Sequence, residues 1–189
     1  MRLLSVLTTP NPDALKFTTE DTLLKEGSRS FTSQTAAEND PLAKALFALE
    51  GVSSVFYMSN FITVNKSMDI SWDELENRIA AIIREFQLNV KEEDSGKEDS
   101  SENVGDVDYA SLNPAQKILS IDRLLDKEIR PGLAGDGGGL EIVSLEENIL
   151  QIHYEGACGT CPSSTTGTLM YIQSVLRTHL DEDLSVIPV

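Results

Sequence analysis

Residues 156–164 are Gly156-Ala157-Cys158-Gly159-Thr160-Cys161-Pro162-Ser163-Ser164, and they contain both cysteines of this 189-residue chain. The stretch follows an alternating, strand-like segment at 149–154 and precedes a helix-like segment that runs to about 180. Two cysteines with two residues between them can direct both sulfurs at one metal ion, at one cluster or at each other. The remaining sequence is therefore expected to be a scaffold around two thiols.

A complete site for zinc or for a four-iron cluster usually takes four ligands, either four thiolates or thiolates with histidine. One chain offers two cysteines and two histidines, His153 and His179. His153 falls on the polar side of its alternating strand, and His179 lies near a helix C-terminus among charged residues, where an imidazole is ordinary. Two copies related by a two-fold axis would instead bring Cys158 and Cys161 of each chain around one site. The residues thus favour a homodimer over a site within one chain.

Three kinds of site stay open on the residues alone. Pro162 followed by Ser163 and Ser164 predicts a helix start, and the positive end of a helix favours thiolates, for metal ligation and redox exchange alike. A strand, then C-x-x-C, then a helix is also the arrangement of a thiol–disulfide oxidoreductase of the thioredoxin type, although the strands before the motif predict an antiparallel hairpin and no βαβ unit. A zinc-binding dimeric interaction module takes the same four thiolates as an iron–sulfur cluster.

Upstream of the motif lie Ile129-Arg130-Pro131-Gly132-Leu133 and Asp136-Gly137-Gly138, and Thr168-Leu169 follow it. With these segments the motif resembles that of the NifU C-terminal domain family, the Nfu iron–sulfur cluster scaffolds and carriers. The resemblance implies that Cys158 and Cys161 of two chains bind one [4Fe-4S] cluster per dimer and that the protein is no enzyme. It also implies two kinds of partner, the upstream cluster-assembly machinery and apo iron–sulfur client proteins. The family usually carries another acidic residue after Asp136-Gly137-Gly138, whereas Gly139 stands there in this chain, which is expected to change a loop and to leave both thiols in place.

Segments of the first half resemble the Nfu N-terminal domain. They are Thr9-Pro10-Asn11-Pro12-Asp13-Ala14-Leu15-Lys16-Phe17, Pro41-Leu42-Ala43-Lys44-Ala45-Leu46-Phe47, and Gly51-Val52 through Asn60-Phe61-Ile62-Thr63-Val64. In that family this half lacks cluster ligands, and residues 1–157 of this chain contain no cysteine. The two resemblances occur in the family's order and together cover most of the chain.

The chain is expected to fold as two small domains joined by an acidic flexible linker. Residues 1–90 form a first domain without ligands and with a docking or stabilising role, 91–110 a disordered linker, and 111–189 the cluster-binding domain. Residues 91–106 hold seven acidic side chains against two lysines, a net charge of −5, in a serine-rich segment typical of disorder. The fold class is α+β, and each domain is a small, mainly antiparallel sheet packed with two helices.

Local signals predict the elements of each domain. In the first domain they predict strands at 3–7, 14–17, 52–58 and 61–64, an edge strand or hairpin arm within 20–33, and helices at about 41–49 and 72–86. In the second they predict a helix from 114 to Pro131, strands at 140–145 and 149–154, a helix over about 163–180 and a final edge strand at 184–189. Ser71 with Glu74 three residues later predicts a capping box. The glycine-rich stretch 132–139 lacks the Gly-Lys-Ser/Thr of a phosphate loop, so a turn packed beside the cysteine loop is expected there.

Charge and hydropathy exclude further classes. A formal net charge of −16 argues against nucleic-acid binding, which needs clustered lysine and arginine. No apolar run has the length of a membrane span, and residues 1–7 are too short for a signal peptide and predict a strand instead. We therefore expect a cytoplasmic protein of bacterial type with protein partners, and a processed organellar form is the alternative.

Overall fold

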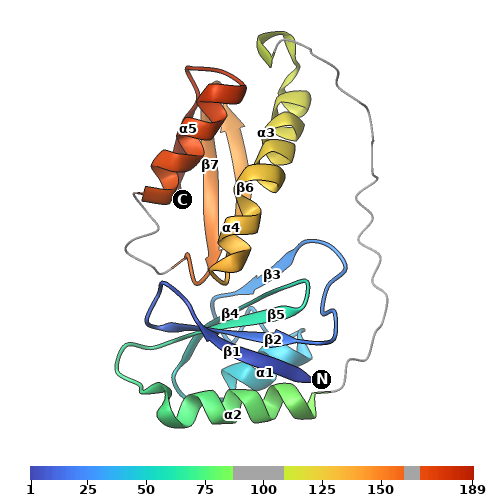
Figure 1. Cartoon of the computed structure of the whole chain (residues 1–189), viewed down its shortest axis with the longest axis vertical. Helices are drawn as coiled ribbons and strands as arrows, with labels where there is room; N and C mark the ends of the chain where they lie inside the picture. The colour runs from blue at the N-terminus through green and yellow to red at the C-terminus, as the bar shows by residue number, and fades with distance from the viewer. Residues whose placement is uncertain (87–108, 160–166) are drawn as a thin grey trace.

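The computed structural model of the chain describes residues 1–86, 109–159 and 167–189. It contains two α+β domains, as predicted, each with its own sheet and its own apolar core (Figure 1). The first domain contains β1 (Leu3–Thr8), β2 (Ala14–Thr19), β3 (Ser28–Phe31), α1 (Pro41–Phe47), β4 (Val52–Met58), β5 (Phe61–Lys66) and α2 (Trp72–Glu85). The second contains the short 3₁₀ helix η1 (Tyr109–Ser111), α3 (Pro114–Glu128), α4 (Arg130–Gly135), β6 (Gly138–Glu146), β7 (Ile149–Gly156), α5 (Leu169–His179) and β8 (Ser185–Pro188).

The first sheet has the strand order β1-β2-β5-β4-β3, and all its pairs are antiparallel. The predicted edge strand within 20–33 is β3. The Asp40 carboxylate starts α1 by accepting the N–H of Ala43 at 2.9 Å. Ser71 caps α2 as predicted, but it does so through the N–H of Asp73 at 3.3 Å rather than through that of Glu74.

Both faces of the first sheet are buried, although only one of them carries the helices. Val55 and Ile62 face α1 and α2 and belong to the first core. The strand alternation places Phe56, Thr63 and Asn65 on the opposite face. Phe56 and Thr63 are nevertheless 0% exposed and Asn65 is 1% exposed, because the second domain covers them. An isolated first domain would expose this face to water.

The second sheet has the order β6-β7-β8, with β6 and β7 antiparallel and β7 and β8 parallel. Asn113 starts α3 with a reciprocal capping box that Gln116 completes. The core between this sheet and its helices is aliphatic. Its fully buried members are Ile121, Leu125, Leu150, Ile152, Ile172, Leu176 and Leu184.

Two features of the second domain differ from the prediction. The helix that begins at Pro114 ends at Glu128, shortly before Pro131 as expected, but an unpredicted helix, α4, begins at Arg130. Pro131 lies in its first turn, where the missing N–H of proline has no helical partner to lose. The glycine-rich stretch is therefore divided between α4 and the start of β6. The expectation that the cysteine motif lies outside a βαβ unit also fails, since α5 connects β7 to the parallel strand β8.

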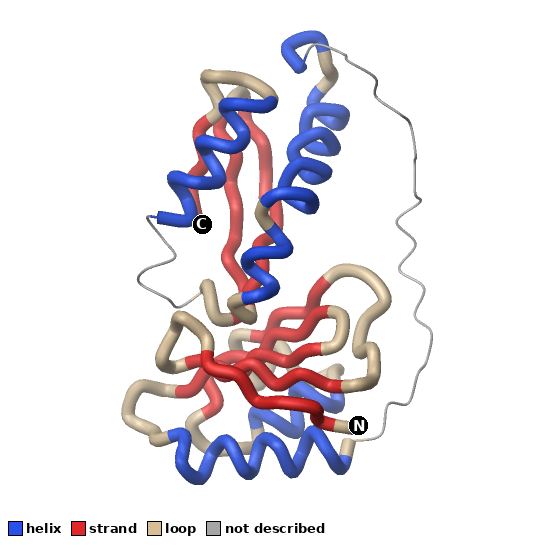
Figure 2. The backbone as a smooth tube through the Cα atoms, in the orientation of Figure 1, coloured by secondary structure: helices blue, strands red, loops and turns tan. Residues whose placement is uncertain are grey.

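The two domains meet at one end of the β6–β7 hairpin. In Figures 1 and 2 this end lies against the sheet of the first domain, while α1 and α2 lie on the far side of that sheet. Most of the predicted linker falls within residues 87–108, outside the described residues, so the domain boundaries at 90 and 110 stay predictions. Among the helices of residues 1–86, 109–159 and 167–189, none has the length and apolar character of a membrane span.

The core of the second domain is tested by truncating α5 on its two sides. Ile172→Ala removes a fully buried side chain and should lower the free energy of unfolding by about 2–5 kcal/mol. Tyr171→Ala changes the neighbouring side chain, which is 55% exposed, and should have an effect of about 0.5 kcal/mol or less. Urea titration followed by circular dichroism measures both. Equal losses in the two variants would contradict the described packing of α5.

Candidate functional site

Cys158 lies in the turn that follows β7, at the end of the hairpin that contacts the first domain; the described part of this cysteine loop is residues 157–159. Cys158 is 4% exposed and belongs to the core of the second domain. Cys161 and the predicted helix start at Pro162 to Ser164 fall in 160–166, outside the described residues. The structure thus places one of the two predicted ligands and leaves the other a prediction.

Glycines make the room in which Cys158 is packed. Gly138 opens β6 opposite Gly156 of β7, and a Cβ built on Gly138 would lie 2.4 Å from Cys158 Sγ. Gly137 has a φ of +78°, a backbone conformation that side chains other than glycine rarely adopt. The predicted packing of the glycine turn beside the cysteine loop is present, and its physical basis is the missing side chain of Gly138.

Neither histidine joins Cys158. His153 is exposed, as its strand position predicted, and its Nδ1 lies 2.9 Å from the carbonyl oxygen of Val189. His179 is in the last turn of α5. In the part of the chain that the structure describes, no three His, Cys, Asp or Glu side chains are grouped so that they could hold a metal ion. A four-ligand site therefore needs ligands beyond those that one described chain brings together.

Tyr154 places a neutral hydroxyl near the cysteine loop. The residue is 6% exposed, and its hydroxyl has no hydrogen-bond partner among the described residues. Burial and, to a smaller degree, the neighbouring Cys158 raise the pKa of Tyr154 to about 12. The phenol therefore stays protonated near neutral pH and keeps an O–H group that can donate a hydrogen bond.

Sequence reasoning missed the residues of the first domain that contact this site. Four side chains, which we call the donor face, bind backbone carbonyls of the second domain, which we call the carbonyl end. The bonds are Asn11 Nδ2 to Ala157 O (3.1 Å), Asn65 Nδ2 to Gly156 O (3.2 Å), Thr63 Oγ1 to Gly137 O (2.6 Å), and Lys16 Nζ to Ala134 O (2.6 Å) and Gly135 O (3.3 Å). Polar side chains at alternate positions of a central strand, Thr63 and Asn65 of β5, were the signal in the sequence.

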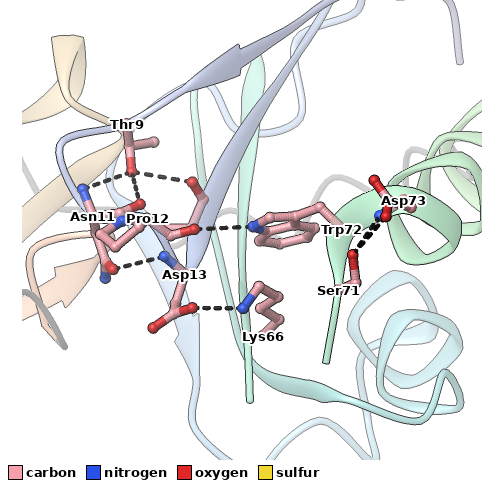
Figure 3. A network of polar contacts seen from close by, with 9 residues as sticks. Thr9, Asn11, Pro12, Asp13, Lys66, Ser71, Trp72 and Asp73 are labelled. Atoms are coloured by element: carbon pink, nitrogen blue, oxygen red, sulfur yellow. Dashed lines mark hydrogen bonds and ion pairs between the residues drawn. The ribbon is translucent and has the colours of Figure 1, made fainter. Parts of the chain in front are cut away.

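The turn between β1 and β2 holds Asn11 in place (Figure 3). Thr9 Oγ1 accepts the N–H of Asn11 at 3.2 Å, and Asn11 Oδ1 accepts the N–H of Asp13 at 3.0 Å. The Asp13 carboxylate in turn accepts a hydrogen bond from Lys66 Nζ at 2.5 Å, which ties the turn to the end of β5. With Oδ1 occupied inside the turn, the Nδ2 of Asn11 is directed at the cysteine loop.

Phe56 fills the space between the two domains. A Cβ built on Gly139 would lie 3.0 Å from its ring, and one built on Gly156 would lie 2.7 Å from it. Beside the ring, Ser28 Oγ donates a 2.8 Å hydrogen bond to the buried carboxylate of Glu155. Gly139 therefore lies in strand β6 and packs against the ring of Phe56. The glycine in place of the family's usual acidic residue was expected to change a loop, but it changes the interface between the two domains.

Two family models match the chain in succession. The model described as "Scaffold protein Nfu/NifU N terminal" matches residues 4–89, and the model described as "NifU-like domain" matches residues 121–187. The chain belongs to the Nfu family. Both domains that the sequence resemblance suggested are confirmed, in the expected order along this Nfu chain.

Curated relatives align with nearly all of this Nfu chain. "NifU-like protein 5, mitochondrial" of Arabidopsis thaliana is 34% identical over 92% of this chain and 63% of its own length. "NFU1 iron-sulfur cluster scaffold homolog, mitochondrial" of Drosophila persimilis is 35% identical over 94% of this chain and 62% of its own length. The chain thus spans less than two thirds of these relatives. A solution structure of a NifU-like protein from Saccharomyces cerevisiae covers 44% of this chain and 77% of its own, with 28% identity and a TM-score of 0.38.

The expectation of a cytoplasmic protein is wrong. Both relatives, and "NifU-like protein 4" of Arabidopsis thaliana, are named as mitochondrial. The expectation rested on the composition and patterning of the folded domains. Those features report how an Nfu domain folds and carry no information about its compartment.

The role of Gly138 is tested by adding one methyl group. Gly138→Ala would place Cβ against Cys158 Sγ and against the backbone oxygen of Glu155, so the cysteine loop must shift, at a cost of about 1–3 kcal/mol in unfolding free energy. Gly132→Ala is the matched control, because a Cβ there meets nothing within 4 Å. Thermal unfolding of both variants gives the measurement. A Gly138→Ala chain as stable as the control would contradict the described seating of Cys158.

The buried carboxylate at the domain interface predicts a pH-dependent stability. Burial raises the pKa of Glu155, with Glu141 adding to the shift and with Ser28, His153 and Arg130 opposing it. The folded chain disfavours the ionised form of Glu155, so this residue lowers the free energy of unfolding near neutral pH. The destabilisation disappears as the pH falls through the raised pKa, because Glu155 is then protonated.

Glu155→Gln should consequently raise the unfolding free energy at about pH 7 and leave it unchanged at about pH 4. Denaturant titrations at the two pH values measure the difference. The control is Glu146→Gln, which alters an exposed carboxylate at the far end of β6 and should leave the pH dependence unchanged. A gain in stability that is equal at both pH values would refute the assigned cause.

Proposed function

We propose that this Nfu protein is a mitochondrial scaffold and carrier of iron–sulfur clusters. It binds one [4Fe-4S] cluster per homodimer through Cys158 and Cys161 of each chain and passes the cluster to apo-proteins. The observation that carries the proposal is the motif at 156–164 within a matched NifU-like domain, preceded by a matched Nfu N-terminal domain. One relative that aligns with 94% of the chain is itself named an iron-sulfur cluster scaffold homolog.

The small number of possible ligands around Cys158 supports ligation shared between two chains. Cys158 is at the end of a hairpin, in a turn whose described neighbours include no further thiol and no histidine ligand set. Four thiolates around one cluster therefore require two copies of the C-x-x-C motif. A cluster held between subunits is easily released when they separate, which suits a carrier.

The chemistry of assembly and transfer is ligand exchange at iron, and it needs no general acid or base. We therefore infer that the protein is not an enzyme. The cluster is its cargo, received from upstream assembly machinery and delivered to iron–sulfur client proteins. The residues of the chain hold the thiols in place, and the neutral hydroxyl of Tyr154 can donate a hydrogen bond beside them.

One structural observation favours a second candidate, a thiol–disulfide oxidoreductase. The motif lies between β7 and α5 of a βαβ unit, which is the setting of a redox C-x-x-C. A fold shared by unrelated activities does not decide between them, and the family membership favours the scaffold. A zinc-binding interaction module would use the same four thiolates.

Anaerobic reconstitution with iron and sulfide tests the proposal. The wild-type chain should take up four irons and four sulfides per dimer, with a doubling of the mass in solution. Cys158→Ser and Cys161→Ser should each abolish uptake, because each removes two of four ligands from the dimer, and should leave the fold intact. Metal and sulfide content, Mössbauer spectra and light scattering on one sample provide the measurement.

His153→Ala is the control and should load fully, since this side chain is exposed and bonded to the C-terminal residue. A Cys158→Ser chain that retained a full cluster would reject the four-thiolate dimer. A colourless wild-type monomer that cycles between dithiol and disulfide would establish the oxidoreductase instead, and uptake of zinc alone would establish the interaction module.

A further inference from the structure

Side chains of the first domain bind the backbone just before Cys158 and the backbone of the strand that faces it. Asn65 and Asn11 bind the carbonyls of Gly156 and Ala157, the two residues that precede the cysteine. Thr63 binds the carbonyl of Gly137, which also accepts the N–H of Ala157. The donor face thus connects the cysteine loop to the strand that faces it.

These hydrogen bonds are formed away from water. Asn11, Thr63 and Asn65 are 3%, 0% and 1% exposed. A buried polar group that loses its partner pays the full cost of desolvation, so the loop cannot lift by itself while the domains stay in contact. Movement of the loop requires the whole donor face to separate from the carbonyl end, after which water can replace each bond.

In the docked arrangement Cys158 is unsuited to bind anything outside its own chain. Its residue is 4% exposed, and its sulfur is packed over Gly138. Gly137, directly before that glycine, is bound by Thr63, so the position of Gly138 is tied to the first domain as well. A thiol that serves a second chain has to leave this location.

We propose that the donor face is a positioning device for Cys158. When the first domain is docked on the carbonyl end, the cysteine loop is closed and the thiol is buried in the cluster-free chain. When the domains separate, the loop opens and the thiol becomes accessible. Asn11, Thr63 and Asn65 act on the site through the backbone that they bind.

What this positioning means for binding of an iron–sulfur cluster rests on the proposed function. A cluster bridged between two chains needs Cys158 at the surface, so loading is coupled to release of the donor face. The burial of the thiol in the docked chain does not depend on that function. Failure of the wild-type chain to take up a cluster would therefore reject the carrier and leave the positioning role to be judged by the experiment that follows.

The experiment measures the reactivity of the Cys158 thiol in the full-length, cluster-free chain. Cys161→Ser leaves Cys158 as the only cysteine of the 189-residue sequence. Thr63→Val removes the hydroxyl with little change of shape, and Thr63→Ser retains it. Asn11→Asp keeps the oxygen that accepts the N–H of Asp13 and replaces the donor that binds Ala157.

Alkylation by excess iodoacetamide, followed by mass spectrometry, should be roughly tenfold faster with Thr63→Val or Asn11→Asp than in the parent chain, because each loses one buried hydrogen bond. Thr63→Ser should restore the parent rate. Small-angle X-ray scattering should show a larger radius of gyration for the two fast variants and an unchanged one for Thr63→Ser, with the same circular dichroism in all four chains.

Three results would overturn the proposal. Equal alkylation rates in all four chains would show that the donor face does not control the thiol. Equal acceleration by Thr63→Val and Thr63→Ser would assign the effect to packing rather than to the hydrogen bond. Faster alkylation without a change in the radius of gyration would show that the loop loosens while the domains stay docked.

Discussion

Buried backbone carbonyls must be paired, and this requirement governs the end of the β6–β7 hairpin. The strand ladder stops at Gly138 and Gly156, so the turn residues beyond it present carbonyl oxygens that their own sheet does not satisfy. N–H groups of the second domain reach the carbonyls of Ala134, Gly137 and Gly156, and side chains of the first domain bind these same oxygens and that of Ala157. The polar composition of that face follows from this need.

The glycines around the cysteine loop serve both the thiol and the interface. Gly138 leaves the space for Cys158 Sγ, and Gly139 and Gly156 leave the space for the ring of Phe56. Gly156 also has a φ of +63°, which a side chain would strain. A change at any of these positions therefore affects the site and the docking of the first domain together. The region behaves as one packed unit built from two domains.

The same loop geometry is compatible with two chemistries. A C-x-x-C between a strand and a helix of a βαβ unit is found where thiols exchange electrons, and four such thiols from two chains suit an iron–sulfur cluster. The Nfu membership weighs for the cluster, because it includes both domains in order and not the motif alone. The first domain then acquires a physical role beside Cys158, although it contains no cysteine of its own.

Much of the fold could be predicted because its causes are local. The apolar spacing of α2 and α3, the turn at Ser59 and the strand alternation around His153 follow from neighbouring residues, and they agree with the structure. Pro131 misled the prediction, since a proline marks the first turn of a helix as well as the end of one. Helix α4 packs on β6, and this contact cannot be read from the residues around Pro131.

The sequence by itself determined the two domains, their α+β class and the two cysteines on which the proposed site depends. It could not show that Glu155, on the polar side of its strand, is buried, nor that Asn11 reaches a residue 146 positions away. Alternation assigns a side chain to a face of a sheet and leaves open what covers that face. Only the tertiary structure decided that the open face of one domain lies on the cysteine loop of the other, because a contact between distant segments depends on the shape and hydrogen bonding of both surfaces at once.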